Sequence, residues 1–168
     1  MYDILIVGGG ISGAVAAISA TRLNMKVLLV ERYGFLGGTL TACGTGPMMT
    51  FHAGDRQVIK GITGEIIDRL VAKGKSPGHI FDTTCYTYTV TPFDAESLKC
   101  ELENMLIEAG GNILYHSFVS DVTLKDNRIT DVTISGKNGS KKISAKIFID
   151  ASGDADISRF AGLGTVLG

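Results

Sequence analysis

The sequence predicts an α/β fold with a parallel sheet, followed by a small antiparallel β-meander. At the start of the chain, the apolar runs Asp3–Val7 and Lys26–Val30 flank an alanine-rich segment, Ile11–Leu23, whose small side chains suit a helix packed closely on a sheet. This order of strand, helix and strand is a βαβ unit, in which the two strands run parallel. Between about residues 118 and 146, β-prone runs alternate with polar turns, which indicates the meander.

Two further helices are expected between these parts. Residues Gly61–Lys73 carry apolar side chains at helical spacing, and Asp94 is suited to cap a second helix that ends at Gly110. The alternating threonine and tyrosine residues of Tyr86–Thr89 resemble an exposed strand. The end of the last strand, Ile147–Ile149, is expected to be buried. The strands of the C-terminal part are expected at Ile113–Phe118, Val119–Leu124, Arg128–Ser135 and Lys141–Ile149.

Composition excludes several classes of protein. The 168 residues fit one domain, and the formal net charge of −1 does not favour nucleic acid or an anionic membrane as a partner. No stretch approaches the roughly 20 apolar residues that a membrane span needs. The three cysteines form neither a C-x-x-C motif nor an even set, so no metal site or disulfide framework is predicted. We therefore expect a soluble, cytoplasmic protein.

Three glycines directly follow the first strand in the pattern G-x-G-x-x-G. Gly8 permits a sharp turn, Gly10 lets the backbone approach a diphosphate, and Gly13 lets the helix pack tightly on the sheet. Ile11 and Ser12 open the helix, whose first N–H groups and partial positive charge suit phosphate oxygens. Because the motif has a strand before it and a helix after it, it predicts a dinucleotide site.

An acidic residue meets the second requirement of such a site. Glu31 ends the second strand, about 20 residues after the glycines, where its carboxylate can accept hydrogen bonds from ribose hydroxyls and would repel a 2′-phosphate. The pattern therefore disfavours NADP. It leaves open whether the dinucleotide is FAD or NAD, and the alternative of an ordinary βαβ unit with an exposed glutamate carries less weight.

The segment that follows, Glu31-Arg32-Tyr33-Gly34-Phe35-Leu36-Gly37-Gly38-Thr39, resembles the FAD-dependent oxidoreductases of the glutathione-reductase and fumarate-reductase type. The resemblance implies a Rossmann-like FAD-binding domain over residues 1–168. It also implies that Glu31 binds the adenosine ribose and Arg32 lies against the adenine. By the same resemblance, Gly37, Gly38 and Thr39 run beside the diphosphate toward the flavin. An NAD-binding lobe, which remains an alternative, has no evident use for this second glycine pair.

A third segment, Ile147–Asp154, resembles the strand end that passes the FAD phosphates in this family, with Ser152 in place of the commoner threonine. The resemblance implies that Ala151, Ser152 and Gly153 contact the cofactor. It further implies that the backbone of Val119 contacts adenine. The three ordered motifs cover essentially the whole chain.

The family's full-length members carry a substrate domain and a C-terminal flavin-contacting segment, and both are expected to be absent here. We therefore expect a FAD-binding lobe of a flavin-dependent oxidoreductase that needs a missing domain, a partner subunit or self-association. The alternative is a catalytically silent nucleotide-binding subunit. No catalytic residue is assigned. We interpret Cys43 as a small buried cysteine, His52 as a loop histidine bonded to backbone, and His79 and His116 as structural.

Overall fold

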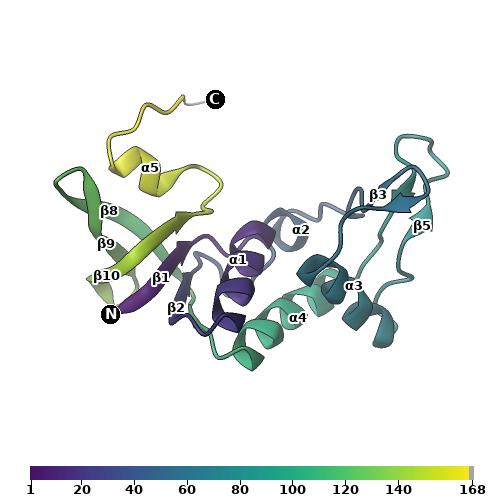
Figure 1. Ribbon diagram of the computed structural model, residues 1–168, viewed down its shortest axis with the longest axis horizontal. Coiled ribbons are helices and arrows are strands. Elements are labelled where there is room, and N and C mark those ends of the chain that lie inside the picture. Colours follow the sequence, from purple (N-terminus) through teal and green to yellow (C-terminus); the bar gives the residue numbers. More distant parts are fainter. Residues whose placement is uncertain (167–168) are drawn as a thin grey trace.

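The computed structural model describes residues 1–166 and has an α/β fold. Its main sheet has six strands: β1 (Tyr2–Val7), β2 (Val27–Val30), β7 (Asn112–Leu114), β8 (Ser117–Lys125), β9 (Arg128–Gly136) and β10 (Gly139–Asp150). They lie in the order β7-β2-β1-β10-β9-β8 (Figure 1). Strands β7, β2, β1 and β10 pair in parallel, whereas β10, β9 and β8 form an antiparallel meander. The predicted fold class is confirmed.

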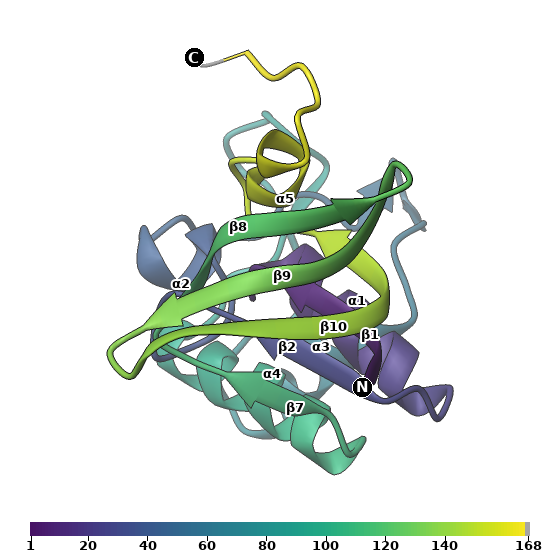
Figure 2. The same cartoon turned by 90° about the vertical axis from the view of Figure 1, so that its left-hand side faces the viewer.

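The long strand β10 joins the two halves of the sheet. Residues Gly139–Ser144 pair with β9, and residues Ala145–Asp150 pair with β1. The meander then folds across one face of the parallel strands, as Figure 2 shows with β1 and β2 behind it. Alternate side chains of β1 and β2, including Leu5 and Val30, pack against Val132 and its neighbours in the meander.

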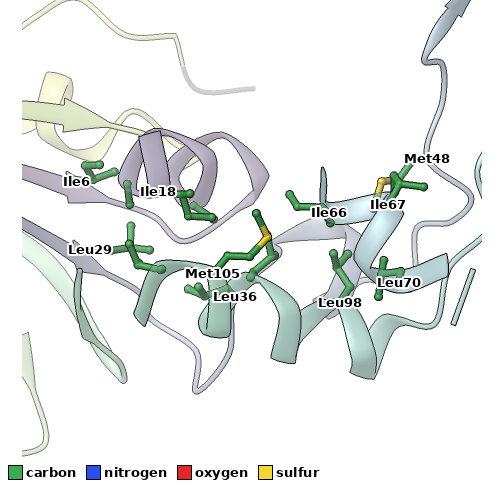
Figure 3. Close-up of a cluster of buried hydrophobic side chains, with 14 of the residues drawn as sticks. Ile6, Ile18, Leu29, Leu36, Met48, Ile66, Ile67, Leu70, Leu98 and Met105 are labelled. Atoms are coloured by element: carbon green, nitrogen blue, oxygen red, sulfur yellow. The ribbon is translucent and has the colours of Figure 1, made fainter. Parts of the chain in front are cut away.

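Five helices are described: α1 (Ile11–Arg22), α2 (Thr39–Ala42), α3 (Ile62–Ala72), α4 (Ala95–Glu108) and α5 (Asp156–Phe160). α1 packs on the other face of the parallel strands, α3 and α4 pack against α1, and the apolar side chains of these helices form one core with Ile6 and Leu29 (Figure 3). The strands β1 and β2 are thus buried on both faces, which explains why they are almost entirely apolar. The side chain of Asp94 caps α4 by accepting a hydrogen bond from the backbone of Ser97.

One prediction for β10 is wrong. Ile147 was expected to be buried, but its side chain is 55% exposed. The physical reason is that α1 packs chiefly over β1 and β2 and does not cover this part of β10. Within residues 1–166, no strand pairs with the second edge of Ala145–Asp150, so this edge of the parallel sheet is open.

An arm of two short hairpins extends beyond the helices, at the end of the molecule opposite the meander (Figure 1). Its strands are β3 (His52–Ala53) paired with β4 (Arg56–Gln57), and β5 (Ile80–Phe81) paired with β6 (Thr89–Val90). The exposed strand predicted over Tyr86–Thr89 is wrong, since only Thr89 belongs to a strand. The carboxylate of Asp82 accepts hydrogen bonds from the backbone and hydroxyl groups of Thr84 and Thr87, which folds the segment into turns.

These hydrogen bonds make the arm sensitive to acid. The hydrogen bond from the Thr84 hydroxyl, together with the bonds from the Thr84 and Thr87 backbones, lowers the pKa of Asp82 from 3.8 to about 2. A carboxyl group whose pKa is depressed in the folded state stabilises that state above its unfolded pKa. This contribution is therefore present above about pH 4 and is lost as the pH falls toward 2.

We expect Asp82→Asn to increase amide hydrogen exchange at Thr84 and Thr87 at pH 7, because the new amide nitrogen cannot accept their N–H groups. In the wild type, the same amides should lose protection as the pH falls from 4 toward 2. Nuclear magnetic resonance measures both effects. Asp55→Asn, at an exposed position of the same arm, is the control and should change neither. Equal exchange in the two variants would contradict the role of Asp82.

Candidate functional site

A pocket of about 880 Å³ opens where the parallel strands β1, β2 and β10 end and α1 begins. Ligands of open α/β sheets bind at this edge, beyond the carboxyl ends of the strands. Every predicted cofactor-binding residue except Gly13 lines it: Gly8, Gly10, Ile11, Ser12, Glu31, Arg32, Gly37, Gly38, Thr39, Val119, Ala151, Ser152 and Gly153.

Gly13 acts through packing. A Cβ atom on Gly13 would overlap the carbonyl oxygen of Gly8, so the helix can lie this close to the first turn only with glycine here. Gly8 in turn lies directly against the backbone of Ala151 and has a φ of +96°, which L side chains rarely adopt. These two glycines bring β1, α1 and the end of β10 together beneath the pocket.

Gly10 differs from both. Its φ of −62° and ψ of 176° are open to any residue, and a Cβ placed there would meet only Gly38 Cα, at 3.9 Å. The protein's own packing therefore does not require glycine at position 10. Because Gly10 lines the pocket and is the N-cap of α1 without a side-chain cap, the missing side chain leaves room for a ligand at the helix N-terminus.

The second glycine pair joins the first turn directly. The backbone of Gly37 donates to the carbonyl of Gly9 at 2.8 Å, and Gly10 and Gly37 form a parallel bridge. Gly38 lies so close that a Cβ on it would be 2.9 Å from Gly10 Cα. The two glycine loops therefore form one continuous backbone surface, with α2 starting at its edge.

Glu31 has a structural task that the sequence did not indicate. Its side chain is only 6% exposed, and its two carboxylate oxygens accept hydrogen bonds from the backbone of Gly9 at 2.6 Å and of Tyr33 at 2.8 Å. Each oxygen keeps further acceptor capacity, and Glu31 lines the pocket. The carboxylate thus fixes the first turn and can still accept a ribose hydroxyl.

Aromatic side chains gather at the outer end of the pocket. Tyr33 and Phe118 both line it and are about half exposed. Tyr33 stacks on Phe35, with ring centroids 5.4 Å apart, and the Lys99 ammonium lies over the Phe35 ring. No role for these aromatic residues was predicted from the sequence, although Tyr33 and Phe35 belong to the segment Glu31–Thr39.

Arg32 lies at the same end and pairs with Asp154 at 3.2 Å, both side chains being exposed. The ion pair links the end of β2 to the turn before α5. Val119 lies beside this end of the pocket in β8. Arg32 and Val119 thus lie where they can reach one ligand group in the pocket.

The turn after β10 is held by one carboxylate. Asp150 accepts hydrogen bonds from the backbone and hydroxyl groups of Ser152 and Ser158. Burial would raise the pKa of Asp150, but these hydrogen bonds outweigh it and lower the pKa. The Ser152 hydroxyl also accepts from the backbone of Asp156, so it shapes the turn beside the pocket.

The inner end of the pocket is lined by the segment after α2 and by α3. Its lining includes Met48, Phe51, Ile59 and Thr63, and none of the lining side chains that the structure describes at this end is charged. Cys43 also lines it and is exposed, so the interpretation of a buried cysteine is wrong. Cys43 ends the short helix α2 at the pocket, where the surrounding loop does not cover it.

His52 lies behind this inner end. Its Nδ1 atom is 2.9 Å from the hydroxyl of Thr89, so the expected hydrogen bond to backbone is replaced by one to a side chain. In the described part of the chain, no group of three or more His, Cys, Asp and Glu side chains could hold a metal ion. Over residues 1–166, no helix has the length and apolar character to cross a membrane.

The fold and this pocket together define a dinucleotide-binding protein of the Rossmann type. The sequence profile of the family "FAD dependent oxidoreductase" matches residues 3–168, so the chain belongs to that family. FAD is therefore the dinucleotide, and the chain is a flavin-binding lobe of this oxidoreductase family.

Individual proteins of known name are similar to this chain in sequence or in fold. The chain is 26% identical to digeranylgeranylglycerophospholipid reductase 2 of Methanothermobacter thermautotrophicus, over 98% of its own length and 43% of the relative's. Its fold is similar to that of THI4 from Thermovibrio ammonificans, with a TM-score of 0.67, 22% identity, and coverage of 97% of this chain and 64% of that one.

A glycerol-3-phosphate dehydrogenase from Bacillus halodurans, solved in complex with FAD, is also similar in fold. Its TM-score is 0.66 at 18% identity, with coverage of 96% of this chain and 36% of that one. The chain thus spans between 36% and 64% of the length of these three proteins.

Substitutions should distinguish Gly10, which leaves space for a ligand, from Gly13, which the packing of the fold requires. We expect Gly10→Ala to leave the melting temperature nearly unchanged and to weaken FAD binding by about tenfold or more, because the methyl group occupies ligand space. Gly13→Ala should instead destabilise the fold by about 1–3 kcal/mol through overpacking. Thermal melts followed by circular dichroism, with flavin titrations, measure both. A Gly10→Ala protein that binds FAD like the wild type would contradict the assigned role of Gly10.

Proposed function

We propose that residues 1–168 form one FAD-binding domain, with its β-meander at about 118–146, that serves a redox enzyme acting on a small substrate. When bound, FAD supplies hydride or electron transfer, and the protein supplies position and electrostatics. The proposal gives roles to the chain's own groups. Gly10, Ile11 and Ser12 offer backbone N–H groups to the diphosphate, which the dipole of α1 also favours.

The remaining roles are given in order along the pocket, from the outer end at Tyr33 and Phe118 to the inner end at Met48 and Phe51. Glu31 accepts hydrogen bonds from the adenosine ribose, while Arg32 and the backbone of Val119 bind the adenine. Gly37, Gly38 and Thr39 on one side, and Ala151, Ser152 and Gly153 on the other, flank the diphosphate. Gly8 and Gly13 hold the helix and the strand ends in place. The apolar inner end then suits the flavin ring, because a flat aromatic ring gains from contact with Met48 and Phe51.

The observation that carries the proposal is the space at Gly10. A glycine that packing does not require, placed at an uncapped helix N-terminus inside a large pocket, suits a ligand with phosphate groups. An NAD-binding lobe is the alternative dinucleotide reading. It is disfavoured because the chain carries a second glycine pair, Gly37–Gly38, bonded to the first turn, for which an NAD-binding lobe has no evident use.

The substrate site requires further protein. The chain spans about half the length of its curated relatives, and the part described leaves one edge of Ala145–Asp150 open. Apolar side chains near the end of the described segment, including Leu163 and Val166, are also exposed. We place the missing part in a further domain, a partner subunit or a second copy of this chain. A silent nucleotide-binding subunit remains the alternative and predicts flavin binding without turnover.

The proposal also places the protein in the cytoplasm. Cys43, Cys85 and Cys100 are all free and exposed. Free, exposed thiols suit a reducing compartment.

A titration tests the cofactor. The purified chain should bind FAD, with quenching of flavin fluorescence and a shifted flavin absorption band, and should bind NAD much more weakly. Binding of NAD with no effect of FAD would reject the proposal.

Glu31→Ala should weaken FAD binding by about 1–3 kcal/mol, because it removes an acceptor for the ribose hydroxyls. Glu96→Ala, at an exposed position in the first turn of α4, is the control for loss of one negative charge. Since Glu31 also bonds the backbone of Gly9, riboflavin should be titrated in parallel. A loss restricted to FAD identifies the ribose contact, and unchanged FAD affinity of Glu31→Ala contradicts it.

Light scattering on the isolated chain should reveal self-association, because apolar side chains and a strand edge are exposed. Association should weaken in Val166→Ser, which removes an exposed apolar side chain outside the pocket. If the isolated chain is a monodisperse monomer that binds FAD tightly, the idea that this lobe needs a further part is contradicted.

A further inference from the structure

Two histidines of the arm lie directly behind the inner wall of the pocket. The rings of His52 and His79 meet edge to face, with centroids 5.1 Å apart. The His79 ring also packs on Phe51 at 4.5 Å, and Phe51 is a buried part of the pocket lining. His79 itself does not line the pocket, so any effect on a ligand must pass through the residues that it supports.

The hydrogen bonds around His79 determine where its proton lies. The side-chain nitrogen of Gln57 donates to the carbonyl of Ile59 at 3.0 Å, and a carbonyl only accepts, so this atom must be the NH₂ group. The same nitrogen lies 3.4 Å from His79 Nε2, which must therefore be the acceptor. The proton then resides on Nδ1 and is donated to the Thr91 hydroxyl at 2.7 Å.

A second proton cannot enter this arrangement without breaking it. A protonated Nε2 would place its N–H against the NH₂ group of Gln57, so two donors would face each other. The Gln57 side chain would have to move away from His79, which would break its hydrogen bond to the carbonyl of Ile59. Ile59 lines the pocket. The neutral form of His79 is thus the form that holds both Phe51 and Ile59.

Burial and two neighbouring titratable groups act on the pKa of His79. Burial, and next the neighbouring His52 of β3, lower the pKa of His79, whereas Asp68 of α3 acts to raise it. The net lowering keeps the imidazole neutral at pH 7. Protonation becomes substantial only in mild acid.

We propose that His79 is a positioning residue for the inner end of the FAD pocket, and that its protonation releases Gln57 and loosens the wall formed by Phe51 and Ile59. Cofactor affinity then falls as His79 becomes protonated in mild acid. The inference rests on the proposed FAD site but concerns its regulation, which the family membership does not supply.

The first test needs no ligand. Nuclear magnetic resonance of the wild-type chain should show His79 as the Nδ1–H tautomer at pH 8. The signals of Ile59 and Phe51 should shift with the same midpoint as the His79 ring on acidification. An Nε2–H tautomer, or Ile59 and Phe51 signals that do not follow the His79 titration, would overturn the proposal.

The second test measures FAD affinity between pH 8 and 5.5. The wild-type dissociation constant should rise about threefold or more as the His79 ring titrates, and His79→Gln should show a much flatter profile. His116→Asn is the matched control, since asparagine tolerates the positive φ of that position, and it should keep the wild-type slope.

The outcomes separate the two proposals. If FAD fails to bind at pH 8, the proposed function of the site is wrong. If FAD binds at pH 8 but the wild type and His79→Gln have the same pH slope, the role of His79 is wrong. Should His79→Gln fail to fold, the titration of the wild-type resonances decides.

Discussion

The site depends on the buried carboxylate of Glu31. By accepting the backbone N–H groups of Gly9 and Tyr33, it ties the turn after β1 to the segment after β2. A buried carboxylate is costly unless hydrogen bonds compensate it, so the folded arrangement of both loops is a condition for placing this charge. The same group faces the pocket, which couples the shape of the site to the fold around it.

The glycines around this carboxylate have two different structural roles. Gly13 and Gly8 bring helix, turn and strand end into contact, and the bridge between Gly10 and Gly37 adds the second loop. The result is a backbone surface with few side chains, backed by the N-terminus of α1. Such a surface can meet a diphosphate closely and needs little rearrangement to do so.

Local patterns predicted the elements whose cause is local. The βαβ unit, the cap at Asp94 and the pocket-lining glycines all follow from short stretches of sequence with a defined backbone requirement. The errors have two different causes. The exposure of Ile147 is a long-range effect, because it depends on which strands α1 covers. The turn at 82–88 is local, but it depends on the Asp82 carboxylate collecting four hydrogen bonds, which the alternation of threonine and tyrosine does not indicate. The contact of His79 with Gln57 and Phe51 joins residues from separate hairpins, which no spacing indicates.

The divided pairing of β10 has a consequence for how the molecule opens. Because one continuous strand belongs to both the meander and the parallel sheet, we expect these parts to unfold together as one cooperative unit. The arm is held by ladders of only two residue pairs each, so it can open as a separate, less stable unit. Local opening therefore reaches the inner wall of the pocket first, while the end that grips the dinucleotide persists until global unfolding.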